Sequence, residues 1–161
     1  MDKMPLIAAL LASTSLQAEE PNNRTVTETY QDWQVVCIEQ DQQARCEARQ
    51  QLVNQNRQPV ALISVGKNDD STILQFALPH LMDLTQVVKI SIDDQKAQSY
   101  PYRFCNQAAC FVQVDGKDPL LASFKKGTAG SLELTPLGQQ PVRFGFSLKG
   151  FSVALERLMK E

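Results

Sequence analysis

Short apolar runs that alternate with a period of two recur along most of this chain. Such alternation places every second side chain on one face of an extended segment, so each run predicts a half-buried β-strand. The predicted strands cover residues 33–37, 44–48, 60–65, 72–78, 87–92, 100–105, 110–114, 120–124, 131–135 and 142–148. Many short strands at near-regular spacing are typical of all-β folds. We therefore predict a mainly β fold class, an antiparallel β-sandwich or barrel-like domain.

The C-terminal segment departs from this period. Its apolar residues recur at i, i+3, i+4 and i+7, as Phe151, Ala154, Leu155 and Leu158. This spacing predicts one amphipathic helix that packs its apolar stripe on the sheet. Gly150 before it suits a positive φ or a close backbone approach. We interpret Gly150, Phe151 and the single tryptophan, Trp33, as structural packing residues rather than ligand contacts.

Four cysteines, Cys37, Cys46, Cys105 and Cys110, fall in the predicted strands. Two-residue hairpin turns at 41–42 and 107–108 would place Cys37 opposite Cys46 and Cys105 opposite Cys110, both at non-hydrogen-bonded positions. There the α-carbons of a pair lie about 4.5 Å apart, which a disulfide tolerates. We predict these two local disulfides, each stapling one hairpin. A longer-range pairing, such as Cys37 with Cys105, would constrain more of the chain, so energetics alone leave it open.

The N-terminal residues differ in composition from the rest. Residues 5–16 form an apolar run too short to span a bilayer, and small Ala18 precedes an acidic pair. This pattern predicts a signal peptide over residues 1–18, cleaved after Ala18; the alternative is an N-terminal helix retained in the fold. Residues 19–29 are polar and expected to be mobile, and residues 30–161 to form a single β-rich domain. The glutamine-rich stretches 40–43 and 50–58 are expected to be exposed hairpin loops.

Composition excludes several classes of function. The chain has 16 basic and 18 acidic residues and a single histidine, which gives no basic surface for nucleic acid and argues against multi-histidine metal sites. We predict no catalytic residues, no metal and no cofactor. Cysteine spacings of eight and four intervening residues do not fit a Cys-x-x-Cys redox site. Lys117 between Asp115 and Asp118 favours a β-turn over a calcium loop.

Several motifs resemble the invasion-associated locus B family. Trp33-Gln34-Val35-Val36-Cys37 is similar to its opening motif, and Pro101-Tyr102-Arg103-Phe104-Cys105 to its middle. The stretch from Phe146 to Leu155 is similar to its closing Ser-Leu-x-Gly-Phe-x-x-Ala motif. The resemblance implies a small exported protein of Gram-negative bacteria, periplasmic or else secreted or surface-associated, with a β-sandwich-like fold. In some pathogenic members it implies a role in host-cell invasion.

No catalytic residues are established for that family, so none is carried over. This sequence also has His80-Leu81-Met82 where family members tend to place glycines. Two hypotheses follow. The first is a non-enzymatic exported protein that binds an envelope or host-cell protein and has no integral membrane segment after signal cleavage. The second is a small envelope enzyme or ligand-binding domain with a cavity near His80, the only candidate for acid–base chemistry at neutral pH; its ligand-binding residues are unknown. We interpret His80 itself as a surface residue.

Overall fold

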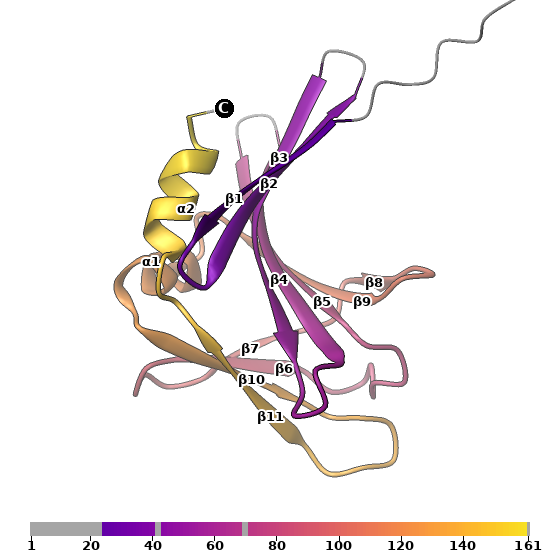
Figure 1. Cartoon of the computed structure of the whole chain (residues 1–161). Coiled ribbons are helices and arrows are strands. Elements are labelled where there is room, and N and C mark those ends of the chain that lie inside the picture. The colour runs from indigo at the N-terminus through magenta and orange to yellow at the C-terminus, as the bar shows by residue number, and fades with distance from the viewer. Residues whose placement is uncertain (1–23, 41–42, 69–70, 161) are drawn as a thin grey trace, which may run out of the picture.

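The computed structural model describes residues 24–40, 43–68 and 71–160 of the chain. Its strands form two antiparallel sheets (Figure 1). In order across the seven-stranded sheet, the strands are β1 (Arg24–Tyr30), β2 (Trp33–Gln40), β3 (Gln43–Val53), β4 (Pro59–Asn68), β5 (Ser71–Leu78), β9 (Cys110–Asp115) and β8 (Phe104–Cys105). The four-stranded sheet has the order β11 (Val142–Ser147), β10 (Ala129–Leu134), β6 (Val88–Ile92) and β7 (Gln98–Tyr100). The predicted mainly β class is confirmed.

The C-terminal helix predicted from the apolar spacing is present as α2 (Phe151–Leu158). Its four apolar positions are all buried, and the helix lies against β1, β2, β3 and β4 of the larger sheet. Arg157 on its outer side forms an ion pair with Glu28 of β1 at 2.8 Å. The helix therefore covers one end of the seven-stranded sheet, as Figure 1 shows.

The strand predicted over residues 120–124 is wrong, because this segment is the helix α1 (Pro119–Lys126). The Asp118 side chain accepts a hydrogen bond from the Leu120 backbone N–H, and Pro119 occupies the first turn. An acidic N-cap followed by proline is a strong helix start. Leu120, Leu121 and Phe124 are buried on one face of this helix. The capping residues before the segment, and not its short apolar run, therefore indicate its secondary structure.

Two further expectations about polar segments need correction. Residues 24–29, expected to be mobile, belong to β1, which pairs with β2 along its whole length from Arg24↔Glu39 to Tyr30↔Trp33. This strand has a polar sequence because it lies at the sheet edge, where most of its side chains are exposed or half-buried. Residues 50–53, expected in an exposed loop, instead extend β3, and Gln50 is only 8% exposed. The proposed signal peptide, residues 1–18, lies outside the described residues.

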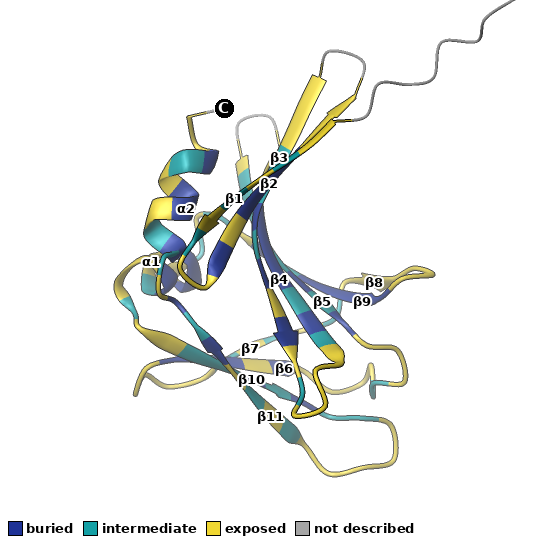
Figure 2. Cartoon of the chain, viewed as in Figure 1, coloured by how far each residue is buried: buried dark blue, intermediate teal, exposed yellow. Residues whose placement is uncertain are grey.

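A cluster of aromatic rings joins the two sheets to both helices. Phe124 of α1 lies at its centre, with ring centroids 5.4 Å from Phe146 of β11, 5.3 Å from Phe151 of α2 and 6.3 Å from Phe76 of β5. Aliphatic residues from both sheets complete one continuous core. Figure 2 shows this division, with buried segments inside and exposed hairpin ends and sheet edges around them.

Both disulfides form within hairpins of the seven-stranded sheet. Cys37 faces Cys46 across β2 and β3, and Cys105 faces Cys110 across β8 and β9, each with a Cα–Cα distance of 4.0 Å. The local pairing favoured by the hairpin geometry is therefore confirmed over the long-range one. Among the described residues, no helix is long and apolar enough to cross a membrane.

Candidate functional site

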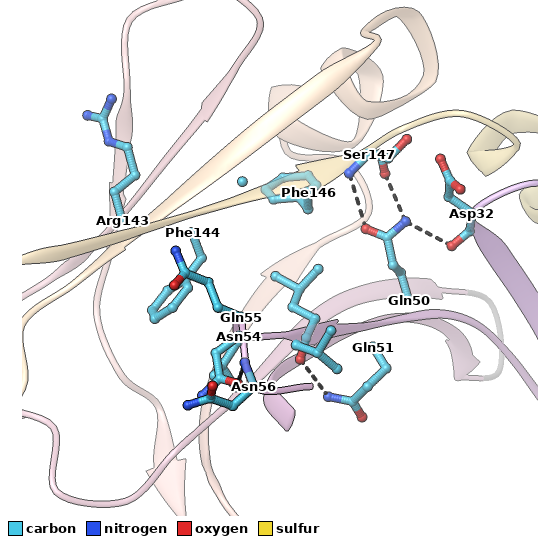
Figure 3. A pocket seen from close by; sticks show the side chains of 14 residues that line it. Asp32, Gln50, Gln51, Asn54, Gln55, Asn56, Arg143, Phe144, Phe146 and Ser147 are labelled. Carbon is cyan, nitrogen blue, oxygen red and sulfur yellow. Dashed lines mark hydrogen bonds between the residues drawn. The ribbon is translucent and has the colours of Figure 1, made fainter. Parts of the chain in front are cut away.

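The candidate site is an open cleft of about 880 Å³ between the end of the β3–β4 hairpin and β11. It lies where the edge of the smaller sheet meets the larger one (Figure 3). Its volume falls within the range of about 300–1,000 Å³ that ligand sites commonly have. The lining consists of Asp32, Val60 and residues 50–56 and 143–147.

Gln50 forms one wall of the cleft and connects the two sheets. Its side-chain Nε2 donates to the carbonyl oxygen of Asp32 at 2.8 Å and to that of Ser147 at 3.1 Å. Its Oε1 accepts from the Ser147 backbone N–H at 3.2 Å. Figure 3 shows these three hydrogen bonds, which join the Gln50 amide to Asp32 on one side and to Ser147 on the other. A buried amide needs such partners because an unpaired polar group costs free energy when it leaves water.

The side-chain amide of Gln50 does what a neighbouring β-strand would do. It both donates to and accepts from the backbone of Ser147, which is the reciprocal pairing of two strand residues. The carbonyl of Ser147 also accepts from Trp33 Nε1 at 2.9 Å. One residue at the end of β11 is thereby fixed to the larger sheet, and the rest of the strand edge borders the cleft.

The opposite end of the cleft carries a cation. Arg143 donates to Glu133 of β10 at 3.2 Å, and its side chain remains 65% exposed. Lys89 of β6 donates to the same carboxylate at 2.8 Å. The pKa of Glu133 lies below its usual range, chiefly because Lys89 donates to its carboxylate; burial opposes this shift, and the hydrogen bond from Arg143 adds to it. Neutral amides, among them Gln51, Gln55 and Asn56, line much of the rest.

The predicted packing residues lie next to the cleft rather than in it. Trp33 and Phe151 are fully buried, with ring centroids 4.7 Å apart in an edge-on arrangement. Gly150 has a φ of +88°, and a Cβ added there would overlap the carbonyl oxygen of Tyr30. Positive φ and close approach are thus both present at this glycine.

His80 does not contribute to the cleft. It is exposed, and its Nε2 lies 2.8 Å from the carbonyl oxygen of Asn106 in the β8–β9 turn. The segment 115–118 forms a turn in which the Asp115 carboxylate accepts from the Lys117 N–H at 2.8 Å, as a β-turn interpretation expects. Within the described ranges, no three histidine, cysteine or acidic side chains gather in a way that could hold a metal ion.

The sequence interpretation missed Gln50, although a signal for it was present. Ala48, Gln50 and Leu52 have the same strand parity, and all three are buried. Continuing the alternation past Ala48 would have placed Gln50 on the inner face. Arg143 and Gly145 had no comparable signal, because an edge strand looks like any other strand until the sheet order is known.

Comparisons with known proteins find this chain similar to proteins named invasion protein B. It is 32% identical over 158 residues to an invasion protein B homolog of Brucella abortus, covering 93% of this chain and 89% of that protein. It is 28% identical over 144 residues to invasion protein B of Bartonella bacilliformis, covering 86% and 77% of the two chains.

A solved structure has the same fold. The crystal structure of invasion associated protein B from Bartonella henselae matches with a TM-score of 0.72 at 28% identity, covering 84% of this chain and 95% of that one. Residues 33–159 match the family described as Invasion associated locus B (IalB) protein. This match extends from Trp33 at the start of β2 to the end of α2, and so includes both disulfides and every residue that lines the cleft except Asp32. The chain belongs to the invasion associated locus B family.

Proposed function

We propose that this chain is a non-enzymatic exported protein that binds a partner protein of the bacterial envelope or the host cell through the cleft beside β11. The observation that carries the proposal is the cleft itself. One side is the edge of β11, which is the outermost strand of its sheet among the described residues, and the other side carries neutral amide side chains. Surfaces of this kind suit another protein, because backbone and amide groups form hydrogen bonds with polypeptide main chain.

An exported location agrees with the disulfides. Structural disulfides form and persist in oxidising compartments, such as the periplasm or the exterior of the cell. The proposed signal peptide, residues 1–18, would provide the route, and the protein would act in the periplasm or else as a secreted or surface-associated protein. Relatives of the chain are named invasion proteins, so the proposed binding would contribute to host-cell invasion.

The test compares two charge reversals next to the same carboxylate, one inside the cleft and one outside it. Arg143→Glu and Lys89→Glu each remove a cation from Glu133 and change the net charge equally, but only Arg143 lines the cleft. Each variant and the unmodified protein, purified in the oxidised form, is cross-linked in extracts of bacterial envelope and of host-cell membranes.

We expect the unmodified protein and Lys89→Glu to capture the same partner, and Arg143→Glu to capture at least about fivefold less, a change of roughly 1 kcal/mol. A deletion strain complemented with Lys89→Glu should invade host cells normally, and one complemented with Arg143→Glu should not. Capture that does not exceed an unrelated exported protein of similar size, or equal capture by both variants, would contradict the proposal.

A further inference from the structure

We infer that the partner is bound as an extended peptide segment that pairs with the outer edge of β11, beyond Ser147, and adds a strand to the four-stranded sheet. This inference rests on the proposed function, since it names the kind of ligand that the cleft takes. Strand addition uses main-chain hydrogen bonds for affinity and pockets for alternate side chains for specificity.

The register of β11 shows which of its backbone groups face the cleft. Leu148 N–H donates to the carbonyl oxygen of Thr128 at 2.9 Å, and the pairing continues as Phe146↔Gly130 and Phe144↔Leu132. In an antiparallel ladder, alternate residues point their N–H and C=O groups to opposite sides. The residues between these, namely Ser147, Gly145 and Arg143, therefore direct their backbone groups away from β10.

The hydrogen bonds of Gln50 agree with this outward direction of the backbone groups, and they show that an amide group fits against this edge. Its amide meets the outward N–H and C=O of Ser147 with a reciprocal pair of hydrogen bonds. Gly145 and Arg143 are the next two outward-facing residues, and β11 is the outermost strand of its sheet in the part of the chain that the structure describes. A peptide entering the cleft would continue the pairing that Gln50 begins.

The lining of the cleft indicates the chemistry of this peptide. Phe144 is half-buried and, like Val60, presents apolar surface to the cleft, which favours an apolar side chain at alternate peptide positions. Gln55 and Asn56 supply neutral hydrogen-bonding groups. The structure thus favours a largely uncharged, extended segment over a compact charged ligand.

Other sheet edges are less suited to this role. β7 and β8 contain only three and two residues, too few for a stable added strand. β1 is longer, but Arg157 of α2 forms an ion pair with its Glu28, and most of its side chains are polar. Charged groups along an edge discourage strand addition, and β1 carries two of them, Arg24 and Glu28, whereas β11 carries Arg143 alone. β11 alone among the described edges borders the cleft.

A pair of substitutions at Gly145 separates backbone recognition from side-chain recognition. Gly145→Pro removes the outward N–H without breaking the ladder with β10, because proline is tolerated where a strand N–H faces outward. Gly145→Ala keeps the N–H, and its Cβ would meet nothing closer than the Gly130 carbonyl oxygen at 3.9 Å. The probe is a displayed library of random decapeptides, selected on the oxidised wild-type protein.

We expect selected peptides to bind the wild-type protein and Gly145→Ala alike, and to lose at least tenfold in affinity for Gly145→Pro. N-methylation at alternate peptide positions should weaken binding to the wild-type protein by a similar factor, which tests the inference without any protein variant. No enriched peptide, or enriched peptides that bind both variants equally and tolerate N-methylation, would overturn it.

The result also separates this inference from the proposed function. If a natural partner is captured in a manner that depends on Arg143 but not on the Gly145 N–H, the proposed function stands and strand addition fails. If peptides pair with β11 while extracts yield no partner, strand addition stands and the proposed function fails.

Discussion

Gln50 is a polar side chain at a position where its strand neighbours on the same face, Ala48 and Leu52, are apolar. Its burial is stabilised by three hydrogen bonds, all to backbone groups of Asp32 and Ser147. Because these two residues lie 18 and 97 positions away in the sequence, a single amide links segments that no local pattern connects. Its identity as glutamine is therefore explained by tertiary structure rather than by strand propensity.

Replacing Gln50 with leucine should destabilise the protein by about 2–4 kcal/mol, because the Ser147 N–H and the Asp32 carbonyl lose their partner inside the protein. The control is Gln51→Leu, since the Gln51 amide also donates to two carbonyls, at 2.6 and 3.2 Å, but its residue is exposed to water. We expect Gln51→Leu to lower the free energy of unfolding by less than about 1 kcal/mol. Urea unfolding followed by Trp33 fluorescence measures both; equal losses would contradict the prediction.

Asp93 should make stability depend on pH. Its carboxylate accepts hydrogen bonds from the N–H of Ala129 and from the N–H and hydroxyl of Thr128, and these hold its pKa below the usual value. A lowered pKa in the folded state gives stability that is present above the unfolded pKa of about 3.9 and is lost as pH falls through the folded pKa.

Asp93→Asn should therefore lower Tm above about pH 5, and the difference from the wild-type protein should shrink below about pH 4. Asparagine keeps one acceptor and tolerates the positive φ of 48° at this position, so the comparison isolates the charge. Asp94→Asn, at the exposed neighbouring residue, is the control. Thermal melts from pH 3 to pH 7 provide the measurement, and a Tm difference independent of pH would count against the assignment.

At the scale of elements, the connection between β11 and α2 depends on Gly150. Gly150→Ala should destabilise by more than about 3 kcal/mol, because the new Cβ overlaps the Tyr30 carbonyl as well as meeting the positive φ. Gly138 is a matched control: its φ is +70° and no atom lies within 4 Å of an added Cβ. Gly138→Ala should cost only about 1–2 kcal/mol. Similar values from denaturant titrations would show that packing against Tyr30 is unimportant.

Strands with a buried face could be predicted from the sequence because their apolar alternation is local. β4, β5 and β9 were found in this way, and so was α2 from its period of 3.6. β1 could not be found by the same criterion, since its half-buried face holds Glu28 between Val26 and Tyr30, and this leaves little apolar alternation to detect. The helix α1 was misread for a different reason: eight residues with three buried apolar side chains fit either period, and only the cap at Asp118 distinguishes them.

The cleft belongs to the scale of the whole molecule and could not be predicted. It forms where the β3–β4 hairpin of one sheet passes β11 of the other, and residues from the two walls lie about 90 positions apart in sequence, as Asn54 and Phe144 do. The four cysteines could be paired beforehand because each bridge is local, whereas the cleft required the order of strands in both sheets.

The aromatic cluster around Phe124 connects the two sheets to each other and to α2. Phe124→Ala should cost about 3–5 kcal/mol, because it removes a fully buried ring that contacts both sheets and α2. Phe104→Ala is the control; this ring is 43% exposed and stacks on Phe111 at 4.8 Å, so about 1 kcal/mol is expected. Equilibrium unfolding of the oxidised protein gives both values. Equal losses of stability in the two variants would mean that the packing of the two sheets does not depend on this cluster.

In both disulfides the two cysteines follow one another in the sequence, with no other cysteine between them. This arrangement has a consequence for how the oxidised protein is made. Cys37 and Cys46 are separated by nine positions, and Cys105 and Cys110 by five. When a chain emerges into an oxidising compartment from its N-terminal end, the first pair is complete long before the third cysteine arrives. An oxidase that joins thiols in order of emergence therefore produces both native bridges directly, and no slow thiol–disulfide exchange is needed to correct them.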